Sequence, residues 1–281
     1  MSRQRDSSTV ERTIPNALSI AGVDPSGGAG VLADIKVMSA LGAYGCAVIA
    51  ALTAQSTRGV SGIAPVPAEF VGQQIDTLFV DVRIDAVKIG MLGQQAVTLI
   101  VAEKLAKWRP EHIVLDPVMV AKSGDHLLER TAIGALRETL LPLANLLTPN
   151  LPEAGVLLEE RPVETVREMR RVAEHLRNKM AHAGQRWVMV KGGHLPGNDT
   201  IDILHDGDHM IEIPGRRIET PNTHGTGCTL SAALAALLPQ TADVPEAAHR
   251  AKAYLVEAIR HSERLQVGSG HGPVHHFHGW W

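Results

Sequence analysis

The sequence predicts an α/β protein, a three-layer α/β/α sandwich built around a mostly parallel central sheet. Short apolar runs alternate with longer segments of helical periodicity along most of the chain, a pattern typical of parallel strands covered by helices on both faces. The chain is 281 residues long with 44% hydrophobic residues, which suffices for a sizeable core. Since neither an internal repeat nor a long linker interrupts the alternation, we expect a flexible polar tail over residues 1–13 and a single domain over residues 14–281.

The apolar runs predict buried strands, and the segments between them predict helices with one apolar face. Strands are expected at residues 17–22, 46–52, 86–92, 113–115, 146–148 and 187–190. Helices are expected at residues 29–41, 68–80, 96–108, 131–140, 164–183, 227–238 and 245–265. The apolar runs 200–204 and 209–213 flank Asp206 and Gly207, a pair that favours tight turns, so they predict a β-hairpin near an edge of the sheet.

Composition and charge exclude several classes of protein. The net charge of -3 and the aromatic content of 3% supply neither a basic surface nor a stacking platform for nucleic acid. The longest apolar run, residues 46–53, is far shorter than the roughly 18 residues of a membrane span. Residues 1–12 lack the apolar core of a signal peptide, and the two cysteines, Cys46 and Cys228, are too few for a disulfide framework. We expect a cytoplasmic protein with reduced thiols that binds neither nucleic acid nor membrane.

Ligands of parallel α/β sheets bind outside the carboxyl ends of the strands, and four unusual clusters are expected there. The first is NTHGTGCTL (222–230), in which Gly225 and Gly227 flank Thr226 directly before an apolar helix. Glycines let backbone N–H groups turn toward one point, and a helix N-terminus there favours an anion such as a phosphoryl group. On spacing alone, a simple glycine-containing N-cap is an equally good interpretation. Cys228 would lie in the first turn, where the pKa of a thiol is lowered, although buried structural thiols are commoner.

The second cluster is the glycine-rich turn GVDPSGGAGVLADIK (22–36), between the first strand and the first helix. It matches neither the dinucleotide-binding glycine pattern nor the P-loop lysine pattern, so we interpret it as a turn beside a small polar substrate. Asp34, inside the following helix, would accept hydrogen bonds from that substrate. The alternative is a solvated carboxylate that pairs with a neighbouring lysine.

The third and fourth clusters supply charge. Asp116 lies at the end of one predicted strand and Glu153 follows the next. Two carboxylates at neighbouring strand ends can hold Mg²⁺ through water molecules, although aspartates before proline and glutamates at helix starts are common without metal. In VKGGH (190–194), Lys191 leaves a strand and could meet the phosphates of ATP; an ordinary surface lysine is the alternative.

The C-terminal segment GPVHHFHGWW (272–281) contains three closely spaced histidines. Transition-metal binding is one interpretation of such a cluster. Because neither a cysteine nor a carboxylate is close by in the sequence, we favour a docked tail in which Phe277, Trp280 and Trp281 bury apolar surface.

Taken together, these segments resemble the hydroxymethylpyrimidine/phosphomethylpyrimidine kinases of thiamine biosynthesis, in the ribokinase-like superfamily. The resemblance spans about residues 16–281, and the matching segments occur in order at compatible spacing. They are AGVDPSGGAGVLAD (21–34), LGAYGC (41–46), TAQ (53–55), VKIGML (87–92), AKSGD (121–125), LTPNLPEA (147–154), KGGH (191–194), NTHGTGC (222–228) and GPVHHFH (272–278). The resemblance implies two successive ATP-dependent phosphorylations, first of the hydroxymethyl group of 4-amino-5-hydroxymethyl-2-methylpyrimidine and then of the resulting monophosphate.

The resemblance also implies roles for individual residues. Gln55 would recognise the aminopyrimidine edge, since its amide offers both a donor and an acceptor. The other residues of the substrate pocket would be Gly22, Asp34, Met91 and Val118. The anion hole and the catalytic group would be Gly225, Gly227 and Cys228, and the residues that bind ATP would be Lys191, Thr223 and Thr226. Asp116 and Glu153 would organise Mg²⁺.

Cys228 favours the narrower assignment, because ribokinase-like enzymes usually have an aspartate as catalytic base at this position and the resembled kinases have a cysteine. The hypothesis is that Cys228, activated by the helix N-terminus, takes the hydroxyl proton late in a loose transition state. A pyridoxine/pyridoxal kinase and a non-catalytic relative that binds the pyrimidine are the alternatives. Family likeness further implies a homodimer whose ligands are ATP and a small pyrimidine.

Overall fold

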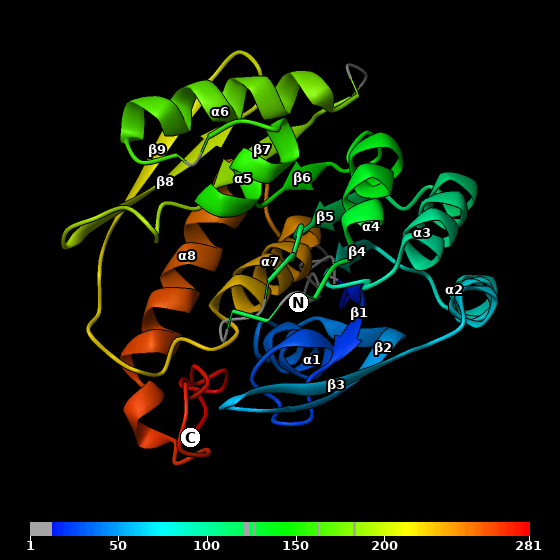
Figure 1. Cartoon of the computed structure of the whole chain (residues 1–281), viewed down its shortest axis with the longest axis horizontal. Helices are drawn as coiled ribbons and strands as arrows, with labels where there is room; N and C mark the ends of the chain where they lie inside the picture. The colour runs from blue at the N-terminus through cyan, green and yellow to red at the C-terminus, as the bar shows by residue number, and fades with distance from the viewer. Residues whose placement is uncertain (1–12, 121–123, 126, 162, 182–183) are drawn as a thin grey trace, which may run out of the picture.

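The computed structural model describes residues 13–120, 124–125, 127–161, 163–181 and 184–281. Their strands form a single sheet of nine strands in the order β3-β2-β1-β4-β5-β6-β7-β8-β9. Helices cover both faces of this sheet (Figure 1), as the predicted three-layer sandwich requires. Apart from Thr13, the predicted N-terminal tail lies outside the described residues. None of the described helices is both long and apolar enough to span a membrane.

Every strand expected from the apolar runs is present, and one further strand appears. The strands are β1 (Asn16–Val23), β2 (Tyr44–Ser56), β3 (Gly59–Pro65), β4 (Ala86–Ile89), β5 (His112–Leu115), β6 (Leu146–Leu147), β7 (Trp187–Val190), β8 (Asp199–His205) and β9 (Met210–Arg216). The hairpin of β8 and β9 lies at one edge of the sheet, which confirms its prediction. The apolar pattern does not predict β3, because its side chains are half-buried or exposed at the opposite edge.

Eight helices are present in the described residues; seven occupy predicted segments with shifted ends, whereas α5, directly after β6, is not predicted. They are α1 (Gly30–Ala40), α2 (Ala68–Asp81), α3 (Gln95–Trp108), α4 (Arg130–Ala135), α5 (Leu151–Leu158), α6 (Val166–Lys179), α7 (Thr226–Leu237) and α8 (Val244–Arg260). A π-helical turn, Leu136–Leu140, continues α4, and short 3₁₀ turns follow α7 and α8. The predicted helix over residues 164–183 includes two residues outside the described ones, and its described part begins at Val166 and ends at Lys179.

The sheet is parallel at its centre and antiparallel at its edges. Strand β1 pairs in parallel with β2 on one side and β4 on the other, and β4 to β7 continue in parallel. Strands β3, β8 and β9 pair antiparallel. The strand order therefore reverses between β1 and β4, and the chain leaves these two neighbours in opposite directions. Such a reversal opens a crevice at the carboxyl ends of the strands, where ligands of open α/β sheets bind.

Two apolar cores hold the layers together, one on each face of the sheet. Helices α2 to α6 pack on one face through side chains such as Ile75, Val101 and Val172. Helices α1, α7 and α8 pack on the other, and nine consecutive buried residues of α7, Thr229–Leu237, form its centre. Helix α7 is mostly alanine and leucine, so it can lie close to the sheet and direct its N-terminus at the crevice.

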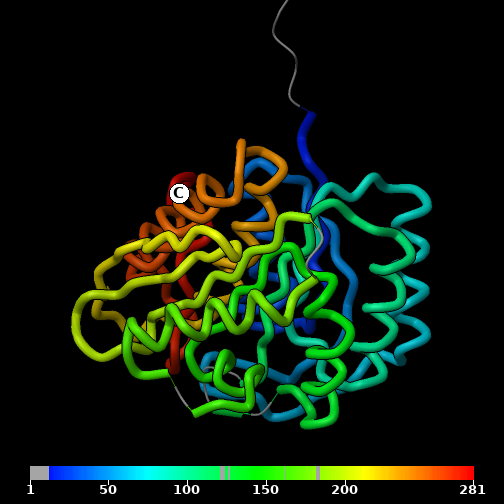
Figure 2. Tube along the Cα trace, turned by 90° about the horizontal axis from the view of Figure 1, so that it is seen from above, coloured from blue at the N-terminus to red at the C-terminus, as the bar shows by residue number. Residues whose placement is uncertain are grey.

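The C-terminal residues dock beside α8, as predicted, but the buried side chains differ from those expected. Val274, His275 and His276 are buried, whereas Trp280 and Trp281 are 72% and 62% exposed. The prediction that the two tryptophans bury apolar surface is therefore wrong. Figure 2 shows this segment in red next to the orange α8, where the Tyr254 hydroxyl donates to the His276 carbonyl.

We call residues 268–276 the C-terminal strap, because they connect two distant loops. The backbone N–H groups of Gly270 and His271 donate to the hydroxyl and the carbonyl of Thr57, at 3.1 and 2.9 Å, in the turn between β2 and β3. On its other side the Gly272 carbonyl accepts from the backbone N–H of His224 at 3.0 Å. The strap thus links the β2–β3 turn to the segment that precedes α7.

Candidate functional site

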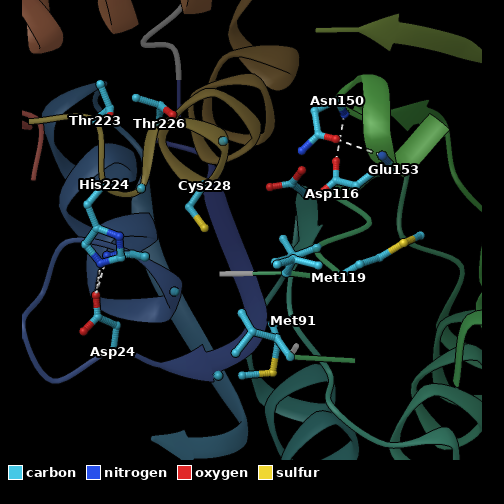
Figure 3. Close-up of a pocket in the computed structure, with 18 of the residues that line it drawn as sticks. Asp24, Met91, Asp116, Met119, Asn150, Glu153, Thr223, His224, Thr226 and Cys228 are labelled. Atoms are coloured by element: carbon cyan, nitrogen blue, oxygen red, sulfur yellow. Dashed lines mark hydrogen bonds and ion pairs between the residues drawn. The ribbon is translucent and has the colours of Figure 1, made fainter. Parts of the chain in front are cut away.

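The crevice contains a cavity of about 460 Å³ at the carboxyl ends of β1, β4 and β5. All the predicted site residues except Asp34 line it: Gly22, Gln55, Met91, Asp116, Val118, Glu153, Lys191, Thr223, Gly225, Thr226, Gly227 and Cys228. A second cavity of about 590 Å³, the adjoining cavity, shares Lys191, Thr223, Thr226 and Gly227 with the first. Figure 3 shows two walls of the main cavity, with Cys228 and His224 on one side and Asp116 and Glu153 on the other.

The first wall, the glycine wall, is made by two backbone loops in direct contact. Gly225 is the N-cap of α7 and has a φ of 77°, which is the left-handed region that favours glycine. A Cβ on this residue would lie 1.7 Å from the carbonyl oxygen of Gly28, so a larger side chain cannot be accommodated without moving a loop. The N-terminus of α7 and that of α1, which begins at Gly30, therefore lie close together and both favour an anion in the cavity.

Asp24 holds the loop that precedes α1. Its carboxylate accepts from the backbone N–H groups of Ser26 and Ala29 at 2.9 and 3.0 Å. It also accepts from the Ser26 hydroxyl and contacts Nε2 of His224 at 2.6 Å. Burial alone would raise the pKa of Asp24, but the hydrogen bonds with His224 and Ser26 lower it overall. Asp24 is therefore ionised, and its carboxylate accepts a hydrogen bond from the Nε2–H group of His224.

Cys228 lies in the first turn of α7 with its thiol directed into the cavity (Figure 3). Burial raises the pKa of this thiol to about 11, against the opposing effects of Lys88 and of a hydrogen bond from the Gly30 backbone. The predicted lowering of the Cys228 pKa is therefore wrong in direction. The helix N-terminus does favour a thiolate, but the surrounding protein atoms exclude the water that would stabilise the charge.

The second wall, the charged wall, is built from side chains at the ends of three neighbouring strands. The Lys191 ammonium lies 2.9 Å from one oxygen of Asp116 and 3.9 Å from one oxygen of Glu153. Asp116 also accepts from the hydroxyls of Ser231 and Thr148 at 3.0 and 3.3 Å. Burial alone would raise the pKa of Asp116, but Lys191, Lys88 and the hydrogen bond from Ser231 hold it below its ordinary value.

Glu153 is the less firmly ionised carboxyl of this wall. Burial raises its pKa to about 7, with a further contribution from Asp116, while Lys191 and backbone hydrogen bonds oppose the rise. The local sequence fixes its position, since Asn150 and Glu153 form a capping box at the start of α5, with distances of 2.8 and 2.9 Å. Two oxygen-donor carboxylates beside a phosphate-sized space fit Mg²⁺, which keeps several water ligands and needs few protein ones.

Lys191 is held by the backbone on both sides. Its own N–H donates to the Pro149 carbonyl at 2.9 Å, and the next N–H, that of Gly192, donates to the buried Asp202 carboxylate at 2.9 Å. A Cβ on Gly192 would lie 1.8 Å from the Ile201 carbonyl oxygen, so the first glycine of this turn is a steric requirement. Lys252 completes the support through an ion pair with Asp202 at 2.5 Å.

The structure does not place Asp34 in the cavity lining. Its side chain is fully buried beneath the site, where it forms an ion pair with Lys88 at 2.8 Å and accepts from the Ser19 hydroxyl at 2.6 Å. The neighbouring-lysine alternative is thus closer to the structure, although the pair is buried rather than solvated. The clue in the sequence was Lys88 itself, a lysine inside the otherwise apolar strand β4.

The remaining predicted residues form the far end of the cavity. Gly22 lies at the end of β1, donates to the Met91 carbonyl at 3.0 Å and leaves space for the Met91 side chain, whose Cε a Cβ would approach to 2.6 Å. Gln55 lies on β2, and its amide oxygen accepts from the Thr53 hydroxyl at 3.2 Å. Val118 follows β5 and is half-buried. This end combines an apolar thioether and aliphatic surface with one amide.

Sequence reasoning assigned no role to Asp24 and His224, which line the same cavity. Both residues were within the quoted motifs, but their contact joins positions 200 residues apart. Neither periodicity nor local spacing contains that information. The two loops meet because α7 packs beside α1 on the same face of the sheet, which is a feature of the assembled fold.

The fold and the site together define a small-molecule kinase of the ribokinase-like class. A sequence profile of the phosphomethylpyrimidine kinase family matches residues 24–275. The chain is 50% identical to the hydroxymethylpyrimidine/phosphomethylpyrimidine kinase of Escherichia coli over 95% of its own length and 98% of that protein. It is 51% identical to the protein of that name from Rhizobium meliloti, over 94% of this chain and 98% of that one. The chain therefore belongs to the phosphomethylpyrimidine kinase family.

Solved structures extend the comparison to a second group of vitamin kinases. The pyridoxal kinase of Staphylococcus aureus, in complex with AMP-PCP and pyridoxal, superposes with a TM-score of 0.86 at 30% identity and covers 96% of each chain. AMP-PCP is an analogue of ATP. Both comparisons agree on a kinase that acts on a small molecule.

Proposed function

We propose that this chain transfers the γ-phosphoryl group of ATP to the hydroxymethyl group of 4-amino-5-hydroxymethyl-2-methylpyrimidine, and then to the resulting monophosphate, for thiamine biosynthesis. The observation that carries the proposal is the meeting of two cavities at Lys191, Thr226 and Gly227. The main cavity, of about 460 Å³, has room for a small ring, and the adjoining cavity, of about 590 Å³, has room for a nucleotide, so a phosphoryl group would pass between them at the glycine wall. The names of the half-identical relatives support this choice of substrate.

In this proposal the ring lies at the far end of the main cavity. Gln55 has a donor and an acceptor in one plane, which match the amino group and a ring nitrogen of the pyrimidine. Met91 and Val118 would pack on the faces of the ring, and Gly22 would allow the ring to approach the backbone. The hydroxymethyl group would then point toward Cys228 and the N-terminus of α7.

The nucleotide would occupy the adjoining cavity. Leu255, Val256 and Ile259 of α8, with Ile218, offer an apolar surface for the base, while Thr223 and Thr226 offer hydroxyls near the shared boundary. Lys191 would contact the phosphates, and Gly225 and Gly227 would provide backbone donors for the charge that develops on the transferred group. Asp116 and Glu153 would hold Mg²⁺, which would neutralise phosphate charge when bound.

Cys228 would be a neutral thiol in the resting enzyme and would not act as a general base. With a pKa of about 11 it is protonated at neutral pH, so its helix N-terminus does not activate it in the resting enzyme. A loose transition state requires little removal of the hydroxyl proton before bond formation. The thiol would then border the acceptor hydroxyl, and any proton transfer to it would come after the phosphoryl group has moved.

We further propose a cytoplasmic homodimer that pairs through the β2–β3 hairpin at the edge of the sheet. Tyr44, Leu52 and Ile63 on this hairpin are 65%, 52% and 42% exposed, which places large apolar groups on an otherwise unprotected sheet edge. Light scattering after gel filtration would measure the mass. A monomer at micromolar concentration, or a dimer unaffected by Leu52→Lys, would count against this interface.

Incubation with the hydroxymethylpyrimidine and Mg-ATP, followed by mass detection of the monophosphate and the diphosphate, tests the proposed activity. The absence of both products would sink it. Because the S. aureus neighbour was solved with pyridoxal, the same assay with pyridoxal measures the alternative, and the ratio of kcat/KM values decides between the substrates. ATP consumption that does not rise when the pyrimidine is added would instead favour a non-catalytic binding protein.

A further inference from the structure

His224 is a buried side chain of the cavity whose second nitrogen is left for a ligand. The residue is 6% exposed, and its Nε2 is committed to Asp24. Within the part of the chain that the structure describes, no hydrogen bond involves Nδ1. The Cδ2 edge of the ring lies against Gly28, where a Cβ would come within 2.4 Å, and Figure 3 shows the Nδ1 edge on the side that faces Cys228.

The surroundings of this nitrogen favour an anion. His224 directly precedes Gly225, the N-cap of α7, and its partner Asp24 accepts from the backbone N–H of Ala29, the N-cap of α1. The imidazole therefore lies between the N-termini of two helices. Because both helices are longer than two turns, each N-terminus carries a partial positive charge. The cavity thus has a polar corner that the neutral pyrimidine alcohol does not need.

The two proposed phosphorylations differ in charge at the acceptor. Transfer from ATP to the alcohol forms an O–P bond, breaks the bond between the γ-phosphorus and the bridging oxygen of ADP, and releases the hydroxyl proton. Transfer to the monophosphate dianion forms and breaks the same kinds of bond without releasing a proton. The second reaction therefore asks the site to hold a phosphate of about two negative charges next to the phosphates of ATP.

We propose that Nδ1 of His224 hydrogen-bonds the phosphate of the monophosphate, which makes His224 a specificity-determining residue for the second phosphorylation. The inference rests on the proposed function. Either partner can donate this hydrogen bond: a protonated Nδ1 donates to the phosphate dianion, or a P–OH group donates to an unprotonated Nδ1. Asp24 fixes the ring by accepting from Nε2, in the manner of a carboxylate that orients a functional histidine.

The other basic side chains of the main cavity lie elsewhere. Among the described lining residues these are Lys191 and His194. Lys191 forms ion pairs with Asp116 and Glu153 on the charged wall, and both Lys191 and His194 border the adjoining cavity. Among the described lining residues, the corner at the two helix N-termini therefore depends on His224 for a basic side chain.

Two substitutions separate the nitrogens of the ring. His224→Gln keeps a donor at the position of Nε2, so it preserves the contact with Asp24 and removes Nδ1. His224→Asn keeps a polar atom near the position of Nδ1 and removes the contact with Asp24. Each variant is assayed separately with the alcohol and with the monophosphate as starting substrate, and monophosphate binding is measured by calorimetry without ATP.

His224→Gln is expected to lower kcat/KM for the monophosphate 10- to 100-fold more than for the alcohol, mostly through KM, since a hydrogen bond to a charged group is lost. Monophosphate binding should weaken by a similar factor. His224→Asn should lower both reactions and leave their ratio within about threefold of the wild-type ratio. Circular dichroism and thermal unfolding verify that both variants are folded.

Equal losses for the two substrates in His224→Gln would show that the ring only holds the loops together and would overturn the proposal. So would a selective loss of the second reaction in His224→Asn alone. These outcomes differ from a failure of the proposed function, in which the wild-type protein phosphorylates neither the alcohol nor the monophosphate.

Discussion

The two walls of the main cavity are built on opposite principles. The glycine wall presents backbone N–H groups from two helix N-termini, and its geometry depends on the absence of side chains at Gly225 and Gly28. The charged wall presents the side chains of Asp116, Glu153 and Lys191, and its geometry depends on ion pairs between strand ends. Backbone donors cannot change their charge, whereas the carboxyl groups can, as the raised pKa of Glu153 shows.

The difference teaches which kind of change each wall tolerates. The glycine wall should fail when atoms are added, because the loops already touch. The charged wall should fail when a charge is removed, because a buried ionic group without its partner destabilises the site strongly. Substitutions on each wall can test this division.

Lys191→Met should have the largest effect, a fall in kcat of about 10³-fold, because it removes the proposed phosphate contact and leaves two carboxyl groups facing each other. Steady-state kinetics at saturating ATP measures it. Lys107→Met is the matched control, since Lys107 is half-exposed and pairs with Asp76 on the surface. A fall below tenfold for Lys191→Met would remove the charged wall from the mechanism.

Gly225→Ala should lower kcat/KM by about 10²-fold, because the new methyl group would collide with the Gly28 carbonyl and displace the donors of the proposed anion hole. The same assay measures the loss. Gly134→Ala adds a methyl group in α4 where no atom lies within 4 Å, so it should leave activity and folding unchanged. Full activity of the Gly225 variant would mean that the two loops move independently.

Acid should weaken the glycine wall through the strap behind it. Burial lowers the pKa of His276 to about 3, helped by the charge of Lys36. The unfolded chain binds a proton below about pH 6.5 that the folded chain binds only near pH 3, so stability is complete above pH 6.5 and falls as the pH drops through this window.

Lowering the pH from 7.5 to 5 should reduce the free energy of unfolding by about 2 kcal/mol through the protonation of His276 in the unfolded chain. Urea unfolding of the wild type and of His276→Gln at both pH values isolates that part. If both proteins lose stability equally between the two pH values, His276 is not the responsible group.

Cys228→Ala should have the smallest effect, a loss of less than about tenfold, well below the 10² to 10⁴ that a general base contributes. The reason is that the thiol is protonated in the resting site. Iodoacetamide should accordingly modify Cys228 more slowly at pH 7 than a free thiol of ordinary pKa. A loss above 10²-fold or rapid alkylation would show that Cys228 acts as a reactive thiolate. A changed pH dependence in Cys228→Asp would show the same.

Much of the fold could be predicted from local pattern, because buried strands and amphipathic helices have distinct periods. The strand β3 could not, since an exposed edge strand has no apolar alternation. For the site, the turns at Gly225 and Lys191 were visible because glycine and the transition from strand to loop are local signals. The contacts of Asp34 with Lys88 and of Asp24 with His224 were not, since each joins segments that are distant in sequence and meet only in the assembled fold.

The pKa of Cys228 shows a different limit. The sequence places the thiol at a helix N-terminus, which lowers a pKa, but the density of protein around it is a property of the assembled fold. The burial of the tryptophans at positions 280 and 281 is also a property of the assembled fold. Their hydrophobicity predicts burial, but the docked segment leaves both side chains exposed.

The C-terminal strap makes the site dependent on the order of synthesis. Thr57 and His224 emerge from the ribosome before the residues that link them, and the hydrogen bonds with Gly270, His271 and Gly272 can form only after those residues are translated. The sheet core can assemble earlier, while the rim of the cavity is completed last. A released chain that ends before residue 270 would hence keep the residues of both cores but lack the hydrogen bonds that fasten the rim of the pocket.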